Sequence, residues 1–115
     1  MSLDISVYLS GYHGENCRTV LVEEDNHNET KSSIRNDIDD HDHAVRAKAL
    51  MEATEHALFE AINVCYAGIE ISEIGRVTHH IAETNGFRPL KNICGHGVGS
   101  HLEMLPEVKV SLFEM

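Results

Sequence analysis

The fold that this sequence predicts is decided by residues 3–15, which read LDISVYLSGYHGE. Apolar residues alternate with polar ones in the first half of this stretch, at Ile5, Val7 and Leu9. That alternation is typical of a strand with one buried face. Ser10 and Gly11 follow as a two-residue turn, because glycine readily adopts the positive φ that a tight hairpin requires. Residues 13–22 then read as the return strand, so we expect the chain to open with an antiparallel β-hairpin.

The turn also fixes which side chains share a face of the hairpin. With Ser10 and Gly11 at the tip, Glu15 pairs with Ser6, and Asp4 lies two residues from Ser6 on the same face. Diagonal neighbours across a hairpin are about 7–8 Å apart at Cα. Two carboxylates at that spacing can hold one or two hard divalent cations. Two acids that simply face solvent are the alternative, and the hairpin alone leaves both open.

Composition excludes several classes of protein. A chain of 115 residues with a hydrophobic fraction of 42% fits one globular domain. It has 9 Lys and Arg against 19 Asp and Glu, for a formal net charge of −10. A chain with this net negative charge repels nucleic-acid phosphates and anionic lipids. We therefore expect no nucleic-acid partner and no membrane partner. Three cysteines without a CxxC motif, and no visible targeting segment, predict an intracellular protein, cytoplasmic or mitochondrial.

An acidic segment and two helices are predicted after the hairpin. Residues 23–43 hold eight of the 19 acidic residues and few apolar ones, which predicts a solvated, mobile acidic insert. From Asp42, apolar residues recur at three- and four-residue steps, which predicts a helix capped by Asp42 and ending before Gly68. A second helix is expected from an N-cap at Ser72 to the Asn-Gly pair at 85–86.

A glycine-rich motif follows the second helix, with GHGVG at residues 95–99. Glycines on both sides of His96 allow another group to approach closely, and a histidine in such a place suits a metal ligand or a general acid–base group. A glycine-rich turn with an incidental histidine is the alternative. Cys17 and Cys94 have no base at motif spacing, so core or loop packing is favoured over a nucleophilic role, and Cys65 is interpreted as a packing residue of the first helix.

In combination these motifs resemble the methionine aminopeptidases of peptidase family M24, and look most like the type I organellar branch. The first carboxylate strand of that family is matched by residues 3–7, its G-[YF]-H-G-D motif by residues 11–15, and its G-H-G-[IV]-G motif by residues 95–99. The resemblance implies an α+β fold over residues 1–115. This would be a partial pita-bread (creatinase/aminopeptidase) domain, with an antiparallel hairpin and short strands covered by two helices.

The resemblance also implies an activity, which is removal of an N-terminal initiator methionine by a water that two metal ions activate. Asp4, Glu15 and His96 match three of the five metal ligands of the family. The implied cofactors are divalent ions (Mn, Co, Fe or Zn), two in a complete family site and at most one here. The implied partners are nascent or short peptides with an N-terminal Met, and self-association through the exposed half-sheet is a further expectation.

The sequence departs from the family pattern at three places. Glu15 stands where the family has Asp, one methylene shorter. Glu103 occupies the position of a substrate-contacting His, with His101 two residues away, so both are candidate substrate-binding residues. The sequence ends at Met115, whereas the two Glu ligands of the family lie further along. No catalytic acid or base is assigned, and the chain is expected to be inactive as it stands. A non-catalytic peptidase-like fragment or binding module is the alternative function.

Overall fold

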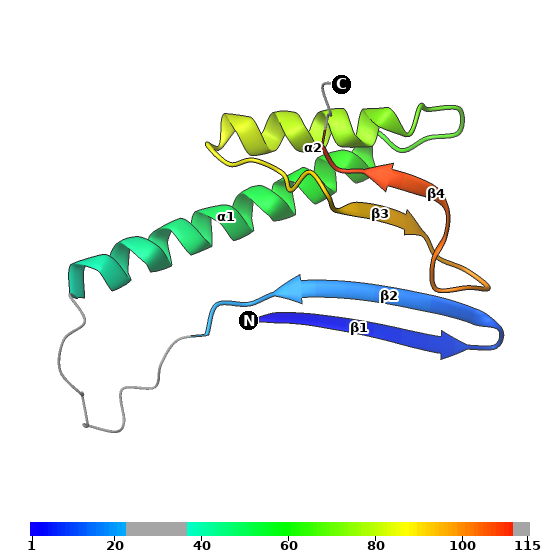
Figure 1. Cartoon of the computed structure of the whole chain (residues 1–115), viewed down its shortest axis with the longest axis horizontal. Coiled ribbons are helices and arrows are strands. Elements are labelled where there is room, and N and C mark those ends of the chain that lie inside the picture. Colours follow the sequence, from blue (N-terminus) through cyan, green and yellow to red (C-terminus); the bar gives the residue numbers. More distant parts are fainter. Residues whose placement is uncertain (23–36, 112–115) are drawn as a thin grey trace.

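The computed structural model describes residues 1–22 and 37–111, with side chains described from residue 42 onward in the second range. The elements in chain order are β1 (Ser2–Leu9), β2 (Tyr12–Thr19), α1 (Asp37–Asn63), α2 (Ser72–Thr84), β3 (Cys94–Gly97) and β4 (Met104–Lys109) (Figure 1). The strands form two antiparallel two-stranded sheets, β1–β2 and β3–β4. The predicted α+β class is confirmed.

The β1–β2 hairpin has the register that the turn residues predict. Ser6 pairs with Glu15, and Asp4 pairs with Cys17. Ser10 has a φ of 53° and Gly11 a φ of 91°. A two-residue hairpin turn of this kind needs positive φ at both positions, which is why a glycine at the second one favours it.

The two faces of the hairpin differ in character. On one face the Ser2 and Thr19 hydroxyls lie 2.9 Å apart, and the rings of Tyr8 and His13 lie 4.8 Å apart at their centroids. On the other face apolar side chains are open to solvent, with exposed fractions of 46% to 77% at Leu3, Ile5, Val7 and Leu9. The predicted alternation is therefore present, but the expected burial of one face is not, because β1 is exposed along its whole length.

The first helix begins earlier than the sequence predicts. α1 starts at Asp37, so Asp42 lies inside the helix and is not its cap. The last seven residues of the predicted acidic insert are helical, and its residues 23–36 lie outside the described residues. Carboxylates are favourable near a helix N-terminus, where the backbone dipole is positive. An acidic composition is therefore compatible with the first turns of a helix.

The second helix has the predicted bounds but not the predicted cap. Ser72 is the first residue of α2, and its hydroxyl donates to Oε2 of Glu70 (3.3 Å) instead of capping the helix. The C-terminal prediction is confirmed, since Gly86 has a φ of 76° and the N–H of Phe87 donates to the carbonyl of Ala82 (2.8 Å). This bonding pattern is the Schellman motif, which glycine favours because it has no Cβ.

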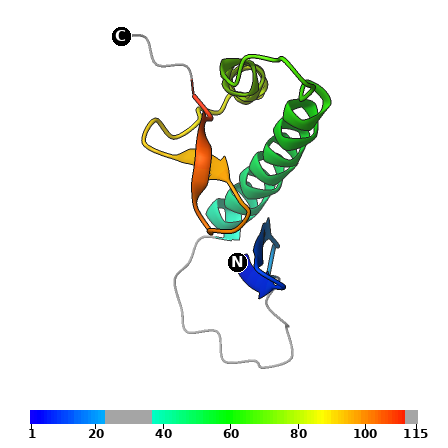
Figure 2. The same ribbon diagram turned by 90° about the vertical axis from the view of Figure 1, so that its right-hand side faces the viewer.

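The helices pack on each other through small side chains, and α2 rests on β4 (Figure 2). The buried apolar residues are Ala53, Ala57 and Ala61, one turn apart on α1, with Ile81 of α2. Alanines at this spacing present a smooth ridge that lets the second helix approach closely. Gly75 of α2 is buried against β4, where an added Cβ would overlap the carbonyl oxygen of Lys109.

Substituting Gly75→Ala is expected to destabilise the chain. Alanine is favoured over glycine by about 1 kcal/mol in a free helix, but here its methyl group must displace β4, and overpacking costs typically about 1–3 kcal/mol. Thermal unfolding followed by circular dichroism should show a lower Tm for Gly75→Ala and an unchanged Tm for His80→Ala, an exposed control on the same helix. A higher Tm for Gly75→Ala would contradict the close contact.

Candidate metal site at the junction of the two sheets

The hairpin meets the rest of the chain at the loop that follows β3. In Figure 1 this loop reaches down onto β2, and Figure 2 shows the same approach from the side. The backbone N–H of His13 donates to the carbonyl oxygen of Gly99 (2.7 Å), and Nδ1 of the His13 ring lies 3.3 Å from the same oxygen. These contacts join residues that are 86 positions apart in the sequence.

Two of the predicted ligands face each other at this junction. Nε2 of His96 lies 3.8 Å from Oε2 of Glu15, and the two side chains are 31% and 29% exposed. Nδ1 of His96 lies 3.1 Å from the carbonyl oxygen of Gly97. Because a carbonyl oxygen only accepts hydrogen bonds, that contact holds the proton of a neutral imidazole on Nδ1. In that neutral tautomer Nε2 carries a lone pair on the side of the carboxylate, whereas a protonated ring would form an ion pair with Glu15.

A lone pair facing a carboxylate oxygen is favourable when a cation lies between them. Metal–nitrogen and metal–oxygen bonds of about 2.1 Å each can span up to roughly 4.2 Å. The separation of 3.8 Å between Glu15 and His96 falls inside that limit. In donor chemistry and spacing, this pair therefore fits one divalent ion.

The third predicted ligand does not join this pair. Asp4 lies on the same face of the hairpin as Glu15, but it pairs with Cys17, two residues further from the turn than Glu15. Within residues 1–22 and the described part of 37–111, no three His, Cys, Asp or Glu side chains converge closely enough to hold a metal ion. The three-ligand site of Asp4, Glu15 and His96 stays a prediction. The structure brings two of these side chains, Glu15 and His96, close together.

The predicted substrate-binding residues lie in the loop between β3 and β4. Both His101 and Glu103 are exposed. Nδ1 of His101 lies 3.3 Å from the hydroxyl of Ser100, and the carbonyl of His101 accepts the N–H of Gly99 (3.1 Å). Their role toward a substrate stays a prediction.

Sequence reasoning missed the role of His13 at the junction and the exposure of the cysteines. It left His13 without a role, although its place in the G-Y-H-G run two residues before Glu15 was a usable signal. It also interpreted the cysteines as packing residues, which is wrong, since Cys17, Cys65 and Cys94 are all exposed. The short strands bury few side chains, and Cys65 lies beyond the end of α1 at Asn63.

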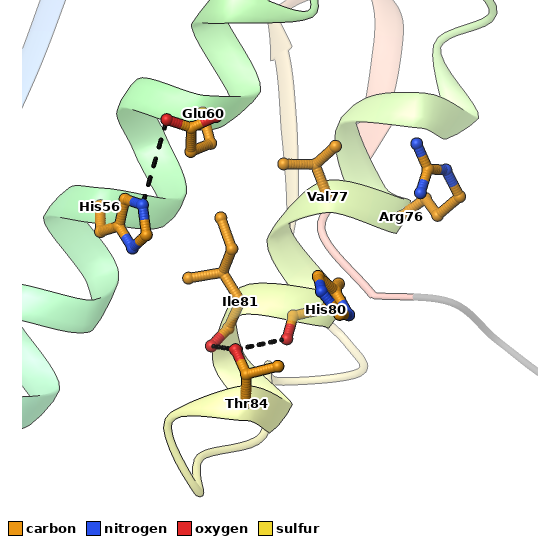
Figure 3. A pocket seen from close by; sticks show the side chains of 7 residues that line it. All are labelled: His56, Glu60, Arg76, Val77, His80, Ile81 and Thr84. Carbon is orange, nitrogen blue, oxygen red and sulfur yellow. Dashed lines mark hydrogen bonds and ion pairs between the residues drawn. The ribbon is translucent and has the colours of Figure 1, made fainter.

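A hollow of about 390 Å³ lies between α1 and α2, away from the junction (Figure 3). Its lining residues are His56, Glu60, Arg76, Val77, His80, Ile81 and Thr84. Nε2 of His56 lies 4.0 Å from Oε1 of Glu60, and Nε of Arg76 donates to Oε2 of Glu73 (2.7 Å). That hydrogen bond lowers the pKa of the Glu73 carboxyl. These are surface pairs along single helices, so the hollow is not the candidate site.

Comparison with known sequences identifies the family of this chain. The profile of metallopeptidase family M24 matches residues 1–111, so the chain belongs to that family. It is 32% identical over 108 residues to methionine aminopeptidase 1D, chloroplastic/mitochondrial, of Arabidopsis thaliana, covering 94% of this chain and 26% of the relative. It is 36% identical over 98 residues to a methionine aminopeptidase of Methanothermus fervidus, covering 85% of this chain and 48% of that protein. The chain thus spans between a quarter and a half of these relatives.

Solved structures support the same fold. The methionine aminopeptidase of Rickettsia prowazekii superposes with a TM-score of 0.76 at 22% identity, covering 96% of this chain and 37% of that one. The enzyme of Thermotoga maritima gives a TM-score of 0.74 at 24% identity, with the same coverage. The fold is therefore part of the pita-bread fold, as predicted. No helix in the described parts of the chain is long and apolar enough to cross a membrane.

Two glycines that flank His96 are expected to respond differently to alanine. A Cβ on Gly97 would lie 2.6 Å from the carbonyl oxygen of Leu105, at the irregularity where β3 and β4 change register. A Cβ on Gly95 would meet Val108 at an ordinary 3.6 Å. Gly97→Ala should lower the Tm by several degrees, while Gly95→Ala, the matched control, should leave it nearly unchanged. Equal effects in calorimetric unfolding would contradict this assignment of the close approach.

Proposed function

We propose that this chain carries part of the metal site of an aminopeptidase that removes methionine from the N-terminus of peptides. The observation that carries the proposal is the approach of Glu15 to His96, which come from the hairpin and from β3. Both residues lie in segments that match the metallopeptidase family. The relatives are named as methionine aminopeptidases, which supports a hydrolase acting on nascent or short peptides with an N-terminal Met.

Glu15 and His96 would hold one divalent ion, with Asp4 as the nearest further carboxylate on that face of the hairpin. A bound ion of this kind lowers the pKa of a coordinated water and polarises a carbonyl group. The contact of Nδ1 with the carbonyl of Gly97 would leave the Nε2 lone pair of His96 available to bind such an ion. Oxygen and imidazole donors suit Mn, Co, Fe and Zn, so the donor types do not select one of these metals.

The structure also gives a reason to propose that this chain, alone, does not turn over substrate. Fewer than three donors converge among the described residues, whereas a water-activating ion needs ligands that hold it firmly while a position stays open. The same observation favours the alternative function, a non-catalytic peptidase-like fragment or binding module. Intracellular location and self-association through the exposed hairpin stay predictions.

Binding of Mn²⁺ tests the proposed site. Isothermal titration of the full chain with MnCl₂ should give one weak site that Glu15→Gln or His96→Ala weakens at least about tenfold, since loss of even an outer partner of a metal ligand costs 10–100-fold. The pair His56 and Glu60 lies at 4.0 Å on α1 and provides matched controls, His56→Ala and Glu60→Gln. If all four variants bind Mn²⁺ like the parent chain, the junction is not a metal site.

Peptide turnover tests the second part of the proposal. The full chain, incubated with a Met-Ala-Ser peptide and added Mn²⁺ or Co²⁺, is expected to release no methionine above the buffer rate, because two converging donors hold an ion too weakly. Mass spectrometry of the peptide provides the measurement. Turnover that His96→Ala abolishes would contradict inactivity and would favour the enzyme over the non-catalytic module.

A further inference from the structure

We propose that His13 is a positioning residue, which holds the loop after β3, and through it the His96 of β3, against the strand carrying Glu15. The inference rests on the metal site proposed at Glu15 and His96, but it concerns a residue outside that donor pair. His13 contacts the loop through two groups, its backbone N–H and Nδ1 of its ring, and both lie against the carbonyl oxygen of Gly99.

The place of His13 in the sequence explains why it acts on the site. His13 lies two residues before Glu15 on β2, so both side chains project from the same face of the hairpin. Gly99 lies three residues after His96 on the other segment. A link between His13 and Gly99 therefore sets the separation of the two segments right beside the 3.8 Å approach of Glu15 to His96.

The imidazole of His13 is itself held in place. The ring of Tyr8, its partner across the hairpin, lies 4.8 Å away at an interplanar angle of 54°. The ring thus packs against Tyr8 while Nδ1 points toward the loop. Because the Gly99 oxygen only accepts hydrogen bonds, Nδ1 is the donor and carries the proton of the neutral ring.

The hairpin depends on such a link because it has little other support. Every residue of β1 is exposed, and β2 is half-buried only at His13 and Gly14. An isolated two-stranded hairpin is marginally stable in water. Its orientation relative to β3 therefore depends on the two contacts of His13 to Gly99. Loss of the ring contact leaves the backbone hydrogen bond in place, and its effect should be seen first in the separation of Glu15 and His96.

Two substitutions separate donation from packing at this position. His13→Asn places an amide N–H near the position of Nδ1, so it keeps a donor for Gly99. His13→Phe keeps a ring against Tyr8 but cannot donate. Asn16→Ala, on the opposite face of the same strand, is the matched control. All are made in the full 115-residue chain, and circular dichroism checks that each variant folds.

The first readout is the contact between Glu15 and His96, seen as a nuclear Overhauser effect between the Glu15 methylene and the His96 ring protons without metal. The second is the Mn²⁺ affinity. We expect His13→Asn and Asn16→Ala to keep the contact and to bind Mn²⁺ within about threefold of the parent chain. His13→Phe should lose the contact and bind about tenfold more weakly, as outer partners of metal ligands typically do.

Every outcome decides the proposal. If His13→Phe keeps the Glu15–His96 contact, or if His13→Asn loses it equally, donation by His13 does not position the loop. If substitution of Glu15 and His96 leaves the Mn²⁺ affinity unchanged, the proposed metal site is wrong. The Glu15–His96 contact measured without metal then still tests the role of His13. If His13→Phe does not fold, the test is made on the parent chain. Long-range ¹H–¹⁵N spectra of its neutral His13 ring should then show the proton on Nδ1. A proton on Nε2 would overturn the proposal.

Discussion

The approach of the hairpin to the loop after β3 is the constraint on which the rest of the candidate site depends. The two segments are distant in sequence, and each alone carries only one member of the proposed ligand pair. The His13–Gly99 contacts bring them together, and Glu15 and His96 then face each other at 3.8 Å. Because the hairpin is otherwise exposed, the geometry of the candidate site depends on how the hairpin is attached to the loop after β3.

The two helices and β4 support β3 and bury little apolar surface. Small residues on α1, and Gly75 on α2, let the helices and β4 approach closely. None of the described side chains is completely buried, and large apolar side chains remain open on the hairpin and along α1. A core this thin contributes little hydrophobic free energy, which scales with the apolar area removed from water. Single polar contacts therefore have more influence here than in a compact domain.

Local sequence signals predicted the parts of the structure that local chemistry determines. The turn at Ser10 and Gly11 fixed the hairpin register, and Gly86 fixed the end of α2 through its positive φ. Features that depend on the surroundings were not predictable in the same way. The alternation in β1 indicates an apolar face but says nothing about what covers it. The acidic residues before Asp42 looked like a loop, since composition alone does not show where the first turn of a helix begins.

The account is tested most directly by anomalous diffraction from crystals of the full chain grown with MnCl₂, which locates the ion without assuming any ligand. It predicts an anomalous peak between Oε2 of Glu15 and Nε2 of His96, about 2.1 Å from each atom. Manganese at another pair, such as His56 and Glu60, with no peak at the junction, would contradict the central claim that the hairpin and the β3 loop together form the site.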